Sequence, residues 1–253
     1  MTPEVELEPC ELLQWDTEHF GLRIGRVRDH RLGANRLREV LSWATDERID
    51  CLYLLADGTD ADTHRLAQAH GFRFVDVRLT LGTERVEEVA SRLSHGAVVR
   101  PARSADIERL RALAADGFRD SRFYADGRFP PAAVDRLFER WLAGSLDGSL
   151  ADLVLVVELS GEAAGYITAR LDPDQRVGTI ELVGTSHPVR RRGVGRALVA
   201  SALAEFARAG MNRASVVTQG RNVAAQRLYQ SCGFRTELVQ VWYHHWADEQ
   251  GHE

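Results

Sequence analysis

The chain of 253 residues contains no lysine, so apart from histidine every basic side chain is an arginine. A nucleotide-binding P-loop ends in Gly-Lys-Ser or Gly-Lys-Thr, and Schiff-base or pyridoxal chemistry needs a lysine amine. Both classes of protein are therefore excluded. The guanidinium groups that remain are planar forks well suited to binding phosphate.

Cysteines, long apolar runs and excess positive charge are scarce as well. Cys10, Cys51 and Cys232 are scattered without metal-ligand spacing, which predicts neither a disulfide framework nor a metal site. No run of about eighteen apolar residues exists, and the first ten residues are acidic, so neither a membrane span nor a leader peptide is predicted. A net charge of −5 argues against nucleic acid as a partner. We expect a cytoplasmic monomer or homodimer without a membrane or nucleic-acid partner.

The most informative stretch runs from Thr179 to Phe206. A short apolar strand leads into the loop Arg190-Arg191-Arg192-Gly193-Val194-Gly195, and a helix with one apolar face follows. The two glycines let main-chain N–H groups crowd together, and the start of the helix adds unpaired N–H groups and the positive end of its dipole. Such a turn is a seat for phosphate. A dinucleotide loop would need a third glycine, and a turn that binds nothing stays open on this stretch alone.

A second pattern lies downstream, with Asn222, Ala225, Tyr229 and Gly233-Phe234 at fixed spacing. This segment and the loop Arg190-x-x-Gly193-x-Gly195 resemble the two signatures of the GNAT acyltransferase superfamily. The resemblance implies an α+β fold, a mixed α/β sandwich in which helices flank a central mixed β-sheet. It also implies acetyl-CoA or another acyl-CoA as co-substrate, no metal, and the amine of a small molecule as acceptor.

The same resemblance assigns roles to individual residues. Tyr229 matches the general acid beside the sulfur of coenzyme A, although a phenol that merely packs under the cofactor is the alternative. Glu181 on the central strand is a candidate base, in competition with a water chain or with a simple solvated carboxylate. The residues implied to hold the coenzyme are Thr185, Ser186, Arg190, Arg191, Arg192, Gly193, Val194, Gly195, Arg196 and Asn222. Of these, Asn222 can also cap the helix that follows it.

The N-terminal part of the chain repeats the C-terminal part at an offset of 162 positions. Gly71-Phe72-Arg73 falls on Gly233-Phe234-Arg235, and the helix pattern of 35–46 and the apolar run 51–56 fall on the cofactor helix and the strand after it. Arg31 occupies the position of Gly193 and Ala67 that of Tyr229. We therefore expect a degenerate half-GNAT domain over residues 1–95, which has lost its cofactor site, and a catalytic GNAT domain over 96–253, with 83–96 as the linker helix. Chance similarity between two αβ units is the alternative.

The acceptor is the least defined partner. Trp15 in an aromatic and acidic cluster, and Arg122, Phe123 and Tyr124 in an irregular aromatic loop, are candidates to contact it, with packing as the alternative. These segments and Trp141 resemble the TDP-fucosamine acetyltransferase group, which implies an amino sugar linked to a nucleotide. An amine from secondary metabolism, and a coenzyme-binding module without activity, are the other two hypotheses.

Overall fold

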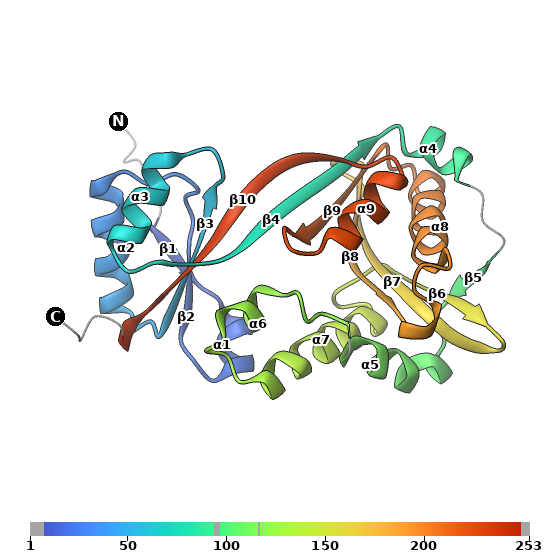
Figure 1. Ribbon diagram of the computed structural model, residues 1–253, viewed down its shortest axis with the longest axis horizontal. Helices are drawn as coiled ribbons and strands as arrows, with labels where there is room; N and C mark the ends of the chain where they lie inside the picture. The colour runs from blue at the N-terminus through green and yellow to red at the C-terminus, as the bar shows by residue number, and fades with distance from the viewer. Residues whose placement is uncertain (1–7, 94–96, 116, 249–253) are drawn as a thin grey trace. The chain divides into compact units, whose positions relative to one another are not determined.

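The computed structural model describes residues 8–93, 97–115 and 117–248, and Figure 1 labels its elements. The strands are β1 (Cys10–Leu12), β2 (Ile24–Val27), β3 (Cys51–Asp57), β4 (Arg73–Glu84), β5 (Val98–Pro101), β6 (Leu153–Leu159), β7 (Glu162–Asp172), β8 (Val177–Thr185), β9 (Arg213–Gln219) and β10 (Arg235–Trp246). The helices are α1 (Gln14–Phe20), α2 (Ala34–Asp46), α3 (Ala61–Ala69), α4 (Val86–Arg92), α5 (Ile107–Ala115), α6 (Arg122–Asp126), α7 (Pro131–Leu146), α8 (Val194–Arg208) and α9 (Val223–Ser231), with 3₁₀ turns at Ser104–Asp106 and His187–Val189.

The chain divides into two compact units. Unit 1 contains Met1–Arg78, Arg122–Phe129 and Val239–Glu253, and unit 2 contains Leu79–Ser121 and Pro130–Leu238. The expected boundary between 95 and 96 falls on residues 94–96, which lie outside the described residues, so the predicted domain limits stay a prediction.

The helix expected over 83–96 is present as α4, but it belongs to unit 2 rather than lying between the units. Strand β4 continues to Glu84, and α4 then packs its Val86, which is fully buried, into the core of unit 2. The polar composition of this segment belongs to the outer face of α4, where Glu87 and Glu88 lie in the first turn.

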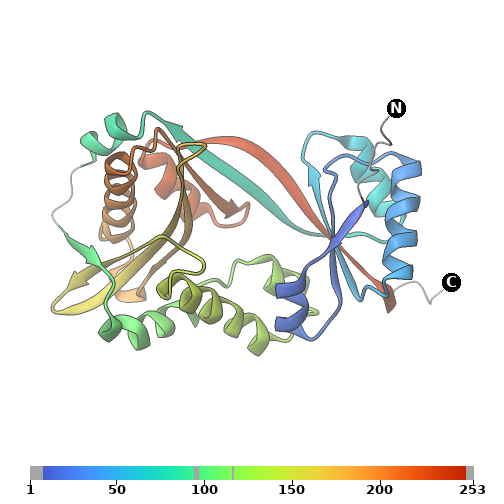
Figure 2. The same ribbon diagram turned by 180° about the vertical axis from the view of Figure 1, so that it is seen from behind.

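Unit 2 contains the mixed sheet flanked by helices that the sequence predicted. Its strands follow the order β4-β9-β8-β7-β6-β5, in which β8 and β9 are parallel and β5 to β8 are antiparallel neighbours. Helix α8 covers one face, and α4 lies beside it in Figure 2. The face of α8 that the sequence predicted to be apolar is buried, with Leu198, Val199, Ala202, Leu203 and Phe206 in one core. Gly178 on β8 allows this close packing, because a Cβ there would lie 2.5 Å from the ring of Phe206.

The central strand β8 carries a β-bulge. Ile180 pairs with Ala169 and Leu182 with Thr168, so Glu181 is an extra residue on β8. The N–H of Leu182 donates to the buried Oγ1 of Thr168 at 3.1 Å. Because an extra residue changes which face later side chains occupy, Ile180 and Val183 both pack against the core under α8.

Unit 1 confirms the internal repeat. The offset of 162 places β9 on β3 and α9 on α3 with identical bounds, and the last residue of α8 on the last residue of α2. In both units a parallel pairing begins at the equivalent residue of the second strand, Cys51 in β3 and Arg213 in β9, although their partners Ile24 and Val177 are not related by the offset. Unit 1 therefore preserves the strand–helix–strand–helix core of unit 2.

The last strand of each repeat crosses into the other unit. Strand β10, which follows α9, pairs with β3 in antiparallel register from Gln240↔Asp57 to Trp246↔Cys51. Strand β4, which follows α3, is the neighbour of β9. The two repeats thus exchange their end strands, so neither core is made from a continuous piece of the chain.

Candidate active site

The turn between β8 and α8 leaves a group of main-chain N–H donors unused. The first hydrogen bond of the helix runs from the N–H of Ala197 to the carbonyl of Gly193, at 3.0 Å. Among the described residues, no acceptor is found for the N–H groups of Arg191, Gly193, Val194, Gly195 and Arg196. These donors lie at the positive end of a 15-residue helix. Their arrangement fits an anion with several oxygen atoms, as diphosphate has.

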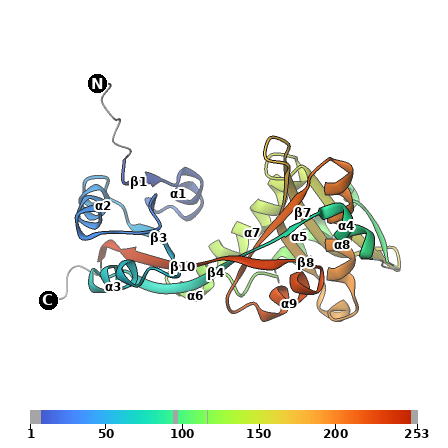
Figure 3. The same cartoon turned by 90° about the horizontal axis from the view of Figure 1, so that it is seen from above.

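Two features of the backbone hold this turn open. Gly193 has φ of +83° and Arg191 has φ of +62°, so the chain turns through left-handed conformations just before the helix. Gly195 is required for another reason, because a Cβ there would lie 3.0 Å from Cδ2 of Leu228 on α9. Figure 3 shows α9 next to α8, with both helices following parallel strands.

The side chains of the turn add positive charge. Arg190, Arg191 and Arg192 are exposed, and none of them has an ion-pair partner among the described residues. Arg196 differs, because its Nη1 donates to the carbonyl of Ser231 at 2.8 Å and so connects α8 to the end of α9. Three unpaired guanidinium groups beside unpaired N–H donors make this turn a strong candidate site for phosphate groups.

The edge of β8 beside the turn is open. Parallel pairing with β9 ends at Ile180↔Val216, whereas β8 continues to Thr185. The N–H of Ser186 donates to the carbonyl of Ala164 at 2.9 Å, on the β7 side. Because N–H groups alternate in direction along a strand, those of Val183 and Thr185 point toward the open edge. This edge can accept an extended ligand with amide groups, and Ser186 can take part only through its side chain.

Asn222 begins α9 in the way that its side chain predicts. Its Oδ1 accepts the N–H of Ala225 at 3.0 Å, so the capping role is present. Gln226 reinforces the same turn, since its Nε2 donates to the carbonyls of Gln219 and Gly220 at 3.1 and 2.8 Å. The side-chain amide N–H groups of Asn222 are still available to a ligand.

Tyr229 lies on the buried face of α9. It is 5% exposed and packs in the same core as Cys232 and Phe234, with a ring-centroid distance of 5.9 Å to the latter. Burial, with a smaller contribution from Cys232, raises the pKa of its phenol well above the ordinary value. The phenol is therefore protonated at neutral pH and can donate a proton or a hydrogen bond.

Glu181 is the residue at the bulge of β8. It is half-buried rather than solvated, and burial raises the pKa of its carboxyl group while the nearby Arg170 opposes the shift. A carboxylate with a raised pKa is a better proton acceptor than one in water. Both groups that the sequence suggested for proton transfer thus lie in unit 2. The same unit contains the open edge of β8 and the turn of residues 190–196, which we call the anion turn.

The residues expected to contact the acceptor lie in unit 1. Arg122 is enclosed by aromatic rings, with its Cζ 4.2 Å from the ring centroids of Tyr53 and Phe123 and 4.3 Å from that of Trp242. Its Nη2 is 3.9 Å from the carboxylate of Asp16. Phe123 is only 8% exposed, while Trp15 and Tyr124 are half-buried. Their contact with an acceptor stays a prediction.

Sequence reasoning missed a buried pair next to Arg122. Nδ1 of His244 forms a short hydrogen bond with Asp126, and Nη1 of Arg122 lies 3.0 Å from Nε2 of the same imidazole. An arginine can only donate, so Nε2 is the acceptor and Nδ1 carries the proton. Burial lowers the pKa of His244 to about 4, although Asp126 opposes this shift. The described residues include no group of His, Cys, Asp and Glu side chains suited to hold a metal.

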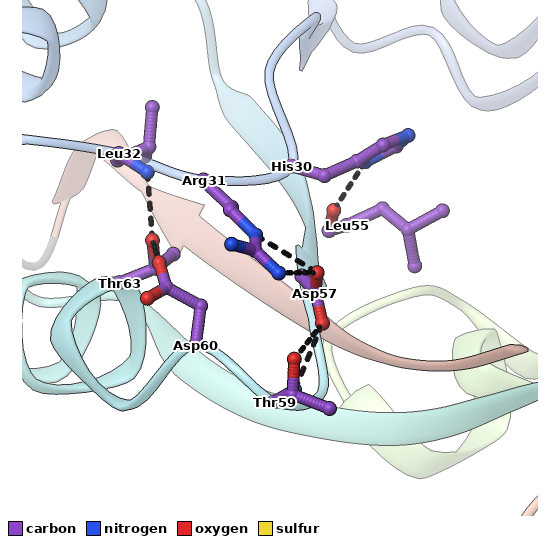
Figure 4. Close-up of polar contacts among 8 residues, drawn as sticks. All are labelled: His30, Arg31, Leu32, Leu55, Asp57, Thr59, Asp60 and Thr63. Atoms are coloured by element: carbon purple, nitrogen blue, oxygen red, sulfur yellow. Dashed lines mark hydrogen bonds and ion pairs between the residues drawn. The ribbon is translucent and has the colours of Figure 1, made fainter.

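The corresponding turn of unit 1 is filled by its own side chains, as Figure 4 shows. Arg31, at the position of Gly193, donates through Nε and Nη2 to Asp57 at 2.9 and 2.8 Å. The N–H of Leu32, at the position of Val194, donates to Oγ1 of Thr63 at 2.7 Å. Thr63 in turn bonds Asp60, which replaces Asn222. A cavity of about 740 Å³ remains beside this turn. Carboxylates line it and the N–H of Leu32 is already bonded, whereas the matching turn of unit 2 offers unused N–H groups to a phosphate.

The comparison with known proteins resolves the family. The model of the acetyltransferase (GNAT) family matches residues 108–234, half of the chain. The chain belongs to the GNAT acetyltransferase family. The protein is therefore an enzyme of a family whose members use acetyl-CoA, and the matched region contains the turn between β8 and α8, the open edge of β8 and Tyr229.

Individual relatives extend this result along the chain. The GNAT protein is 28% identical to dTDP-fucosamine acetyltransferase of Escherichia coli O6:H1 over 248 residues, 96% of this chain and 99% of the relative. It is 26% identical over 150 residues to the spore coat polysaccharide biosynthesis protein SpsD of Bacillus subtilis, covering 59% of this chain and about half (51%) of SpsD. A solved GCN5-related N-acetyltransferase from Sphaerobacter thermophilus has the same fold, with a TM-score of 0.64 and 18% identity over 93% of this chain and 75% of that one. No helix in the described part of the chain is long and apolar enough to cross a membrane.

Proposed function

We propose that this GNAT protein transfers an acetyl group from acetyl-CoA to the primary amine of an amino sugar linked to a nucleotide. The observation that carries the donor half of the proposal is the set of five N–H groups without acceptors between β8 and α8. The acceptor half is supported by the relative named dTDP-fucosamine acetyltransferase, which aligns over nearly the whole of both chains.

The residues of unit 2 fit the coenzyme from its diphosphate to its sulfur. The N–H groups of 191 and 193–196 and the free arginines of the turn bind the diphosphate, whose charge the start of α8 favours. The pantetheine arm, which contains two amides, pairs with the open edge of β8 near Thr185 and with the side-chain amide of Asn222. Laying the arm along a fixed strand places the thioester at a defined position, so the attacking amine meets it in one orientation.

Proton transfer completes the reaction. The amine must be neutral to form a bond with the acyl carbon, and Glu181, directly or through water, accepts the proton that the amine loses. The thiolate of coenzyme A leaves as the C–S bond breaks, and Tyr229 supplies its proton. Because burial keeps the phenol of Tyr229 protonated at neutral pH, it is in the correct state for an acid.

The decisive experiment incubates the protein with acetyl-CoA and dTDP-fucosamine and follows free thiol and product mass. We expect release of coenzyme A together with a product heavier by one acetyl group. A panel of other amines, from amino sugars without a nucleotide to amines of secondary metabolism, is tested in parallel. Acetylation of one of these in place of the nucleotide sugar would overturn the acceptor assignment, and coenzyme binding without any acetylated product would favour a module that has lost activity.

A further inference from the structure

Tyr166 on β7 has a buried hydroxyl without a partner. The residue is 0% exposed, and no hydrogen-bond partner for its hydroxyl is found among the described residues. A buried polar group without a partner is rare and costs stability, so it calls for a physical reason. Neither the family signatures nor the proposed roles of Glu181 and Tyr229 involve this residue.

The position of Tyr166 directs the hydroxyl to the reacting end of the coenzyme site. Its cross-strand partner on β8 is Gly184, next to Thr185. A Cβ on Gly184 would lie 2.8 Å from Cζ of the Tyr166 ring and still closer to Cε1. The far end of the ring, which carries the hydroxyl, therefore lies over β8 rather than over β7. The hydroxyl therefore lies buried over β8 at the level of Gly184, in the part of the strand that no longer pairs with β9.

The face of the sheet is also defined. Ile167 packs in the core under α8, and Tyr166, the preceding residue of the strand, projects from the opposite face. Ile180 and Val183 both pack on the face under α8. The bulge places Glu181 and Leu182 between them, so we infer that these two side chains lie on the opposite face. The phenol and the candidate base thus lie on one face, at the open edge of the strand.

We propose that Tyr166 binds the acyl group itself, by donating a hydrogen bond from its hydroxyl to the carbonyl oxygen of the thioester. The inference rests on the proposed use of β8 by the coenzyme. Together with the outward N–H of Thr185, it gives the carbonyl oxygen two donors, and both bonds strengthen as negative charge develops on that oxygen during attack by the amine. Burial raises the pKa of Tyr166, which keeps the hydroxyl protonated, so it acts as a donor and loses no proton in the reaction.

The first test compares acetyl-CoA with free coenzyme A by calorimetry on the full chain. Tyr166→Phe should weaken acetyl-CoA binding by about fivefold, the value of one neutral hydrogen bond, and leave coenzyme A binding unchanged. Tyr243→Phe is the matched control, because the Tyr243 hydroxyl already has a partner in Nδ1 of His64 at 3.1 Å. This control should bind both ligands as the wild type does. If Tyr166→Phe bound acetyl-CoA as tightly as the wild type does, the proposal would be overturned. If the wild type bound neither acetyl-CoA nor coenzyme A, the proposed function itself would be overturned.

The second test measures turnover and melting temperature together. Because the orphan hydroxyl stabilises nothing in the free protein, Tyr166→Phe should melt at the same temperature or higher. Turnover should fall by about 10²-fold, equally at all pH values between about 6 and 9, since the tyrosine stays protonated. A loss of turnover that follows a lower melting temperature, or turnover within about twofold of the wild type, would contradict a role in binding the acyl group.

Discussion

The buried pair of His244 and Asp126 predicts that unit 1 loses stability in mild acid. A histidine with a pKa of about 4 in the folded chain and about 6.5 in the unfolded chain is neutral in both states above pH 6.5. As the pH falls below 6.5, the unfolded chain binds the proton first, so stability is lost progressively down to about pH 4. The full difference of about 2.5 units corresponds to about 3 kcal/mol, of which about 2 kcal/mol is lost by pH 5.

The assay is urea unfolding followed by tryptophan fluorescence, which reports mainly on unit 1 because Trp15, Trp43, Trp242 and Trp246 lie there. His244→Asn should be less stable than the wild type at pH 7.5, and this deficit should shrink by about 2 kcal/mol at pH 5. Tyr243→Phe, next to it on β10, should keep the wild-type dependence on pH. The reasoning would be refuted if the difference between the wild type and His244→Asn stayed constant from pH 7.5 to 5, because the imidazole would then titrate alike in both states.

Three further predictions concern the coenzyme sites. Tyr229→Phe should lower turnover, measured as release of free coenzyme A thiol, by about 10²-fold with little change in coenzyme affinity. Unchanged turnover would show that Tyr229 is not the general acid. Gly193→Ala should lower the free energy of unfolding in urea by about 1 kcal/mol because of its positive φ, and it should also weaken coenzyme binding. The control Gly148→Ala has φ of +84° but lies outside the anion turn, so it should lose stability without losing coenzyme affinity. Calorimetry should give one coenzyme per chain, because Asp57 holds Arg31 in the matching turn of unit 1, and a second site would contradict that reading.

The elements that depend on local pattern were predicted well. The spacing of apolar residues between Thr179 and Phe206 indicated a helix after the glycine turn, and α8 begins there at Val194. The repeat was visible because both units bury the same kinds of residue at the same spacing, and its offset holds for β3 and α3 in the structure. The turn between β8 and α8 was predicted from the order of strand, glycines and helix, and its N–H groups without acceptors agree with that prediction.

The features that depend on distant parts of the chain were not predicted. Helix α1 has only seven residues, and its end is defined by Gly21 with φ of +68°, so no helical period could be seen. The exchange of β4 and β10 between the two repeats follows from pairing across more than 120 residues, which no local window contains. The same holds for residues 122–129, whose place in unit 1 depends on contacts of Arg122 and Asp126 with His244.

The bulge at Glu181 explains why several site features occur at one point of β8. An extra residue bends a strand and increases its twist, and the pairing of β8 with β9 ends at Ile180, immediately before that residue. The open edge is therefore produced by the same irregularity that sets the direction of Glu181. Thr168 supports the bulge by accepting the N–H of Leu182, and a side-chain acceptor on the neighbouring strand cannot be recognised from the period of β8 itself. Regular alternation would have continued the pairing with β9, so the departure from the pattern, rather than the pattern, creates the open edge at which we propose that the coenzyme binds.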